Sequence, residues 1–203
     1  AYSPDGDYSW SNESGICLGC YIPQFIGPVK SGGWAKLMPN SLIVGEFTKE
    51  TRPSDADTKF DKRMYASLFF DAANYGDKVP NEKWYGNNYS MDDLWEGNEG
   101  KMAGGAPSFN VNGTAGKFLI KKNTAYYVDD KAPDNMGNKE GRSSNLRVMR
   151  FAEVLLLYAE ACAKTNDPDG ANYALKQIRQ RAGLTEKTFE QAELMNEIEH
   201  QCL

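Results

Sequence analysis

The sequence predicts a mainly α-helical fold in which a C-terminal helix hairpin carries a long, loop-rich region with short strands. Apolar residues recur at the 3.6-residue period of an α-helix on both sides of a short turn within residues 147–184. Glycine and tryptophan lie mostly ahead of that segment, because all four Trp precede residue 96 and 17 of the 19 Gly precede residue 145. We therefore expect one domain over residues 1–203, with 1–145 as the loop-rich region and 146–203 as the helical scaffold.

The first helix of the hairpin is expected to begin near residue 151. Its apolar residues follow the spacing i, i+3, i+4, i+7, i+8 and i+11, which places them on one stripe of the helix. We expect this stripe to face the core of the protein. Its members are Phe151, Val154, Leu155, Tyr158, Ala159 and Cys162.

The second helix has start and stop signals at both ends. Asp167 can cap its N-terminus and Pro168 suits the first helical position. Gly183 suits the left-handed residue that ends a helix. Between these signals the apolar residues again have helical spacing, at Ala171, Ala174, Leu175, Ile178 and Ala182. The pattern predicts two antiparallel helices joined by a tight turn.

The residue identities of this hairpin, and not only their period, resemble the SusD/RagB family. Residues 150–161 read Arg-Phe-Ala-Glu-Val-Leu-Leu-Leu-Tyr-Ala-Glu-Ala, which is similar to the family's Arg-aromatic-Ala-Glu-Val-Leu-Leu-x-Tyr-Ala-Glu-Ala. Residues 178–184 read Ile-Arg-Gln-Arg-Ala-Gly-Leu, similar to the family's Ile/Val-Arg-x-Arg-Ala-Gly-Leu. A looser landmark is a short helix over residues 42–47, followed by Asp61-Lys62-Arg63 where the family has Asp-Pro-Arg.

The resemblance implies a SusD-like fold with a tetratricopeptide-type helical array. Family members are surface nutrient-binding lipoproteins that sit on outer-membrane TonB-dependent transporters. This implies a SusC-like transporter and an oligosaccharide or other nutrient as partners, at the extracellular face of the outer membrane. It also implies that these 203 residues are a C-terminal portion, attached to the membrane only through a lipid anchor absent from this chain.

The other predicted elements are short. Residues 16–21 and 117–127 suggest strand pieces, and residues 66–70 suggest a strand or a helix end. Residues 71–116 are rich in Gly, Asn, Asp and aromatic side chains and show no period. So long a stretch without periodicity is expected to be a functional loop region.

A last helix is predicted near the C-terminus. Thr188 and Gln191 fit a capping box that would open it. Leu194, Ile198 and Cys202 would then lie along one side of this helix.

Aromatic side chains in the loop-rich region are the candidate ligand-binding residues. Sugar recognition needs flat rings that stack on pyranose C–H surfaces, together with polar groups that bond the hydroxyls. Trp10 and Trp34 are the first candidates because they lie in glycine- and serine-rich surroundings. The candidate set is Tyr8, Trp10, Trp34, Trp84 and Tyr85. For each of them, the alternative is a ring that anchors the core or a loop.

Composition argues against several other functions. A net charge of −5 does not suit a nucleic-acid surface, and no apolar run reaches the ~18 residues of a membrane helix. Cys17 and Cys20 form a C-x-x-C, but a second pair of zinc ligands is missing from a sequence with one histidine. The acidic cluster Asp55, Asp57 and Asp61 lacks calcium-loop spacing and is interpreted as solvated carboxylates. We therefore expect no metal and no cofactor.

The sequence favours a non-catalytic binding protein over two alternatives. One alternative is a helical-repeat scaffold that binds a partner protein in the hairpin's groove. The other is a glycoside hydrolase, for which Glu153 and Glu160 would be the carboxylate pair. Residues seven apart on a helix are separated by roughly 10 Å along its axis. Arg150, Arg179 and Arg181 are near in sequence or across the hairpin. We therefore interpret both carboxylates as structural ion pairs or helix-end bonds, and expect no catalytic residue.

Overall fold

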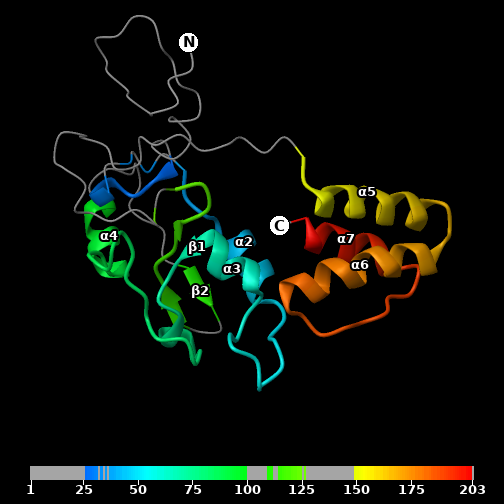
Figure 1. Ribbon diagram of the computed structural model, residues 1–203, viewed down its shortest axis with the longest axis horizontal. Coiled ribbons are helices and arrows are strands. Elements are labelled where there is room, and N and C mark those ends of the chain that lie inside the picture. Colours follow the sequence, from blue (N-terminus) through cyan, green and yellow to red (C-terminus); the bar gives the residue numbers. More distant parts are fainter. Residues whose placement is uncertain are drawn as a thin grey trace, which may run out of the picture. The chain divides into compact units, whose positions relative to one another are not determined.

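The computed structural model of the chain describes residues 26–31, 33, 35, 37–99, 109–111, 114–124, 126 and 149–202 (Figure 1). The chain divides into two compact units. The loop unit comprises Ala1–Ser41 and Tyr65–Leu146, and the helical unit comprises Leu42–Met64 and Arg147–Leu203. The strand predicted over residues 16–21 lies outside the described residues.

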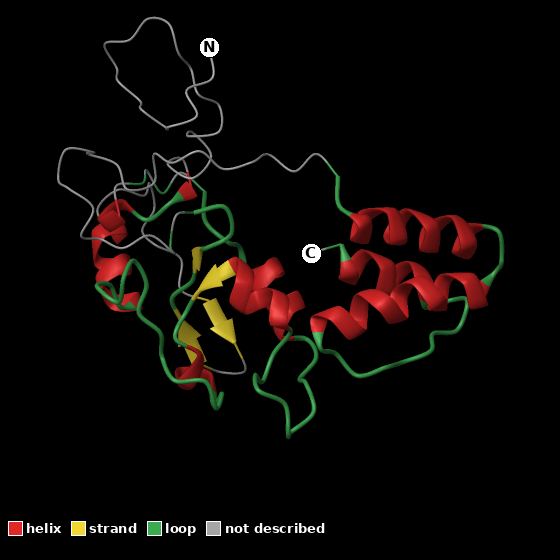
Figure 2. Cartoon of the chain, viewed as in Figure 1, coloured by secondary structure: helices red, strands yellow, loops and turns green. Residues whose placement is uncertain are grey.

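The described part of the chain is mainly helical, which confirms the predicted fold class (Figure 2). None of its helices is long and apolar enough to span a bilayer. The strands form two antiparallel pairs, β1 (Leu68–Phe69) with β4 (Leu119–Ile120) and β2 (Phe109–Val111) with β3 (Thr114–Gly116). The helices are α2 (Ser41–Thr48), α3 (Lys62–Ser67), α4 (Met91–Glu99), α5 (Phe151–Lys164), α6 (Pro168–Ala182) and α7 (Leu194–Gln201), with 3-10 turns η1 (Val29–Ser31) and η2 (Ala72–Tyr75).

The predicted hairpin is confirmed as α5 and α6, and its second helix has the expected ends. The Asp167 carboxylate accepts a hydrogen bond from the Gly170 amide at 3.0 Å, which satisfies a free N–H of the first turn. Pro168 occupies the start of α6. Gly183 has a φ of 74°, and its amide bonds the Gln180 carbonyl at 3.1 Å. Both ends of α6 are therefore determined by residues in or next to the helix itself.

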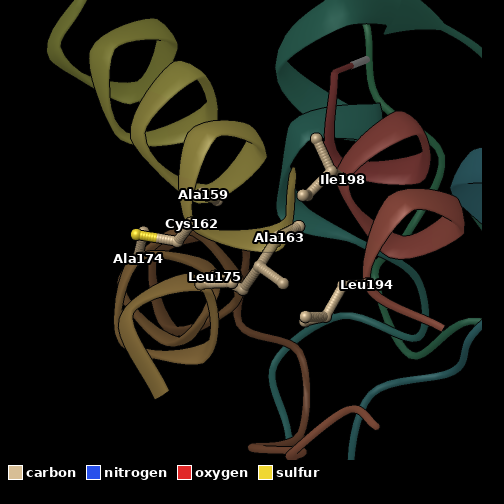
Figure 3. Close-up of a cluster of buried hydrophobic side chains, with 8 residues drawn as sticks. Ala159, Cys162, Ala163, Ala174, Leu175, Leu194 and Ile198 are labelled. Carbon is tan, nitrogen blue, oxygen red and sulfur yellow. The ribbon is translucent and has the colours of Figure 1, made fainter. Parts of the chain in front are cut away.

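The core of the helical unit lies where α5, α6 and α7 meet. Figure 3 shows side chains from the three helices pointing toward one another. Alanines dominate the facing surfaces of α5 and α6, so the two backbones can approach closely. Larger apolar side chains of α7 fill the remaining space. The buried cluster is Ala159, Cys162, Ala163, Ala171, Ala174, Leu175, Leu194 and Ile198.

The prediction for which face of α5 is buried was wrong in part. Ala159 and Cys162 are buried as expected, but Phe151, Val154 and Tyr158 are exposed. The helix is apolar around much of its circumference, so periodicity alone does not identify the side that packs. Cys202 was also expected on the apolar side of the last helix, and it is exposed.

The predicted start of the last helix was also wrong. Residues 184–190 have no regular secondary structure, and α7 begins at Leu194. Gln191 does not cap this helix, because its side-chain amide donates to the Ala163 carbonyl near the end of α5 at 2.6 Å. The side chain of Gln191 therefore bridges two elements.

A fully buried arginine joins α6 to the rest of the helical unit. The Arg179 guanidinium donates to both carboxylate oxygens of Glu50, at 2.9 and 2.7 Å, and to Glu197 of α7 at 2.6 Å. Its Nε and Nη2 donate to the Thr185 carbonyl at 3.1 and 2.9 Å. Buried charges need partners of this kind, because an unpaired one is strongly destabilising. Glu160 forms a structural ion pair as expected, but its partner is Lys164 on the surface of α5 and not an arginine.

Residues 42–64, assigned from sequence to the loop-rich region, bond to the C-terminal helices at three further points. Glu46 of α2 accepts from His200, Arg52 donates to the Gly183 carbonyl, and Arg63 donates to the side chain and carbonyl of Gln201. Arg63 is oriented by Asp61, which is buried rather than solvated as expected. The segment is therefore an integral part of the helical unit.

We expect opposite effects from alanine at two glycines of the helical unit. At Gly183 a Cβ would lie 2.5 Å from the Arg52 side chain at a left-handed φ, so Gly183→Ala should destabilise by about 1–3 kcal/mol. At Gly45, within α2, a Cβ would meet nothing within 4 Å, so Gly45→Ala should stabilise by up to about 1 kcal/mol. Urea denaturation measures both. Equal changes in the free energy of unfolding for the two substitutions would contradict the left-handed helix end at Gly183.

We also expect the Glu50–Arg179 pair to contribute less to stability in acid. Hydrogen bonds from Arg179 lower the pKa of Glu50 from 4.5 to about 2. A carboxyl with a depressed folded-state pKa stabilises the fold above its unfolded pKa and loses that contribution as pH falls. The stability difference between the wild type and Glu50→Gln should therefore shrink between pH 4.5 and about 2.

The matched control is Glu186→Gln, which removes an exposed ion pair with Lys176 and should change stability by less than about 1 kcal/mol. A wild-type advantage over Glu50→Gln that stays constant across the acid range would contradict the pairing.

Candidate functional site

The candidate site is a cleft of 760 Å³ in the loop unit. It is lined by residues 81–87, which we call the rim loop, together with Lys121 and Tyr126. The lining mixes aromatic, amide and charged side chains. Such a mixture can contact both the apolar and the hydroxyl surface of a small polar ligand.

The rim loop is closed by backbone hydrogen bonds. The Trp84 amide donates to the Tyr89 carbonyl at 2.9 Å, and the Tyr89 amide returns a bond of 3.2 Å. The Tyr85 amide donates to the Tyr126 carbonyl at 3.0 Å, and the Asn88 side chain donates to the Tyr85 carbonyl at 2.7 Å. These bonds connect the rim loop to the segment that follows β4.

The tip of the rim loop has an unusual backbone. Tyr85, Gly86 and Asn87 have φ values of 56°, 71° and 66°. Positive φ is common for Gly and tolerated by Asn, but it is costly for a residue as bulky as Tyr. The Tyr85 ring is almost completely buried, and this burial offsets the backbone cost. Backbone strain that the surrounding packing maintains is characteristic of ligand-binding sites.

An aromatic cluster forms the floor of the cleft. The Trp84 ring meets Phe69 of β1 edge to face, with centroids 5.0 Å apart, a favoured aromatic geometry. The centroid of the Tyr85 ring lies 6.2 Å from that of the Phe69 ring. Met91, Leu94 and Trp95 of α4, with Leu119 of β4, complete the buried cluster. The rings of Trp84 and Tyr85 are therefore held in place.

Helix α4, which supports this floor, was missed in the sequence. Its start is a reciprocal capping box, because the Ser90 amide and hydroxyl donate to Asp93 at 2.8 and 2.6 Å, and the Asp93 amide donates back to Ser90 Oγ at 3.3 Å. The signal was present as Ser-x-x-Asp, followed by apolar residues at helical spacing. The surrounding Gly and Asn residues concealed it.

Lys121 is a buried cation in the wall of the cleft. Its ammonium donates to the Tyr65 carbonyl at 3.0 Å and lies 3.6 Å from the Glu82 carboxylate. It also lies 4.7 Å from the centroid of the Tyr126 ring, a cation–π distance. Burial lowers the pKa of Lys121, and the negative charge of Glu82 partly opposes that shift. Glu82 in turn accepts the Trp84 indole N–H at 3.1 Å.

The structure locates part of the predicted ligand-binding set. Trp84 and Tyr85 line the cleft together, at its floor. Tyr8, Trp10 and Trp34 lie outside the described residues. Sequence reasoning missed Lys121 and Tyr126. Nothing local indicates that a lysine in a Lys-Lys-Asn run is buried, or that Tyr126 bonds to Tyr85, 41 positions earlier.

Comparisons with known proteins agree on one family. The whole chain, residues 1–203, matches the model of the SusD family. A SusD superfamily protein from Bacteroides vulgatus superposes with a TM-score of 0.58 at 21% identity, over 88% of this chain and 32% of that one. A SusD-like protein from Bacteroides fragilis superposes with a TM-score of 0.53 at 20% identity, over 98% of this chain and 39% of that one. The chain thus spans well under half the length of these two solved structures. No curated protein matches the chain.

Removing the observed helix cap should weaken the floor of the cleft. Ser90→Ala deletes the capping hydroxyl of α4 and should cost about 1 kcal/mol of unfolding free energy. Thr188→Ala is the matched control, because Thr188 is exposed in a segment without regular secondary structure ahead of α7, and its replacement should be nearly neutral. Chemical denaturation compares them. A larger loss for Thr188→Ala would contradict both helix assignments.

Proposed function

This chain belongs to the SusD family, and we propose that it is part of a non-catalytic surface protein that binds an oligosaccharide or other nutrient. The bound nutrient would pass to a SusC-like, TonB-dependent transporter in the outer membrane. The protein would be held at the extracellular face of the outer membrane by a lipid anchor. Family membership supports the role, and the cleft in the loop unit supports a ligand site there.

The observation that carries this proposal is the cleft above the aromatic cluster. Asn81 and Asn87 are exposed on the rim loop, where their amides can donate to and accept from sugar hydroxyls. Tyr126 is half-buried beside Lys121 and can contribute both ring surface and a hydroxyl. A ligand entering the cleft would therefore meet polar groups at the edge and aromatic groups below.

The five aromatic residues singled out in the sequence would have two roles. Trp84 and Tyr85 would shape the floor and keep the rim loop open, because their rings are packed within the cluster. Tyr8, Trp10 and Trp34 would provide stacking surfaces for further sugar units. Their glycine- and serine-rich neighbourhoods support that assignment.

The chemistry of the cleft supports binding over hydrolysis. Glycosidases of the usual kind place two carboxyl groups on either side of the scissile bond. Among the described lining residues the cleft presents one carboxylate, Glu82, which is already bonded to the Trp84 indole and paired with Lys121. The other pair considered, Glu153 and Glu160, lies on α5 in the helical unit.

Binding measurements on a panel of oligosaccharides test this function. For the glycan that binds, Asn87→Ala and Tyr126→Ala should each weaken affinity about tenfold, or ~1.4 kcal/mol, by removing a hydrogen bond or ring contact. The matched controls are Asn196→Ala on α7 and Tyr173→Ala on α6, both exposed in the helical unit. The measurement is isothermal titration calorimetry.

Two results would contradict the proposal. One is equal affinity for the cleft variants and their controls. The other is release of reducing sugar when the purified protein is incubated with the bound glycan, which would show hydrolysis.

A further inference from the structure

The Glu82 carboxylate is held through one of its oxygens and accessible at the other. Both of its partners act on Oε2, because the Trp84 indole N–H donates to it at 3.1 Å and the Lys121 ammonium lies 3.6 Å from it. Among the described residues, no group donates a hydrogen bond to Oε1, which we call the open oxygen. The Glu82 side chain lines the cleft and is 53% exposed, so a ligand can reach it.

The two groups that hold Oε2 are themselves fixed. The Trp84 ring is buried in the aromatic cluster, and the Lys121 side chain is only 10% exposed and donates to the Tyr65 carbonyl at 3.0 Å. If Glu82 turned away, the buried ammonium would lose its counter-charge, which is costly. The open oxygen is therefore positioned before a ligand binds, and Trp84 and Lys121 are its positioning residues.

The chemistry of the open oxygen restricts what can bind to it. An ionised carboxylate accepts hydrogen bonds and donates none, so the ligand must supply a donor. A hydroxyl group forms a charge-assisted bond there, roughly twice as strong as a bond between neutral groups. A cationic donor gains less, because Lys121 already neutralises Glu82 and Lys83 is exposed beside it. A carboxylate or sulfate has no proton to share and is repelled.

We propose that Glu82 makes the cleft selective for uncharged sugar units, because its open oxygen accepts a hydrogen bond from a ligand hydroxyl and excludes a unit that carries a carboxylate or sulfate at that position. This inference rests on the proposed function, since it requires an oligosaccharide in the cleft. It adds the class of oligosaccharide and the residue that discriminates.

Glutamine at position 82 would reverse the polarity of the open position. The indole N–H of Trp84 and the ammonium of Lys121 both donate, so the oxygen of the new amide must face them. Its NH2 group would then replace the open oxygen. This donor can bond a hydroxyl oxygen only without charge assistance, and it can also bond the carboxylate or sulfate that Glu82 excludes.

Calorimetric titration with matched pairs of oligosaccharides tests the proposal. The probes are gluco-, xylo-, manno- and galacto-oligosaccharides, each with a counterpart that carries uronic acid or sulfate groups. The wild type should bind a neutral probe about tenfold or more tightly than its acidic counterpart. Glu82→Gln should weaken the neutral probe about tenfold. It should also bind the acidic counterpart about threefold or more tightly than Glu82→Ala does, because alanine presents no N–H.

The matched control is Glu96→Gln. Glu96 is exposed on α4 in the same unit and does not line the cleft, so its replacement removes the same charge and should change neither affinity. Melting temperatures of all variants show whether each one folds. A variant that is only destabilised would bind both members of a pair more weakly, whereas loss of the open oxygen changes their ratio.

Two results would overturn the inference and leave oligosaccharide binding in place. One is tighter binding of the acidic counterparts by the wild type, together with loss of that binding in Lys83→Met, which would assign the cleft to acidic glycans. The other is the same neutral-to-acidic affinity ratio for Glu82→Gln and Glu96→Gln. Binding of none of the probes would instead contradict the proposed function itself, and this inference with it.

Discussion

The helical unit depends on the burial of one guanidinium group. Arg179 is inaccessible to solvent, and its donors are directed at Glu50, at Glu197 and at the Thr185 carbonyl. Because a buried charge without partners is strongly destabilising, α6, α7 and the segment after α2 must all be in place together. Glu50 and Arg179 are 129 positions apart in sequence, so this interaction joins two segments of the helical unit that are separated along the chain by Tyr65–Leu146 of the loop unit.

The second family run, residues 178–184, can now be explained by packing. Ile178, Ala182 and Leu184 are buried, Arg179 forms the ion cluster, and Gly183 ends α6 where its carbonyl accepts from Arg52. Gly is favoured there, because a Cβ would be strained at the left-handed φ and would lie 2.5 Å from the Arg52 side chain. The family run therefore specifies a scaffold and is independent of ligand chemistry. For this reason the resemblance predicted the fold directly but gave no information on which ligand the loops bind.

Local signals were the predictable part of this structure. Asp167, Pro168 and Gly183 define the ends of α6 from neighbouring residues alone, and the sequence identified all three. The partners of Arg179 could not be predicted, since Glu50 and Glu197 become neighbours only through the tertiary fold. The exposed residues Phe151, Val154 and Tyr158 of α5 were predicted to face the core for a related reason. Helical spacing of apolar residues does not indicate which side of a helix is buried when the helix is apolar on more than one side. The residues that line the cleft were likewise predictable only in part. Trp84 and Tyr85 were predicted because they are aromatic residues in the loop-rich region, whereas Lys121 and Tyr126 lie at the cleft only through hydrogen bonds to residues far away in the sequence.

The rim loop is built before any ligand arrives. Tyr85 holds a left-handed backbone because its buried ring and its bond to the Tyr126 carbonyl compensate the strain. The conformational cost of ordering the loop is therefore met during folding, and a ligand need not meet it again. A cleft that is open and fixed in shape gains specificity from its rim, while its modest enclosure limits the area that a ligand can bury. That combination suits the proposed function, in which the protein would select a nutrient and then release it to a transporter.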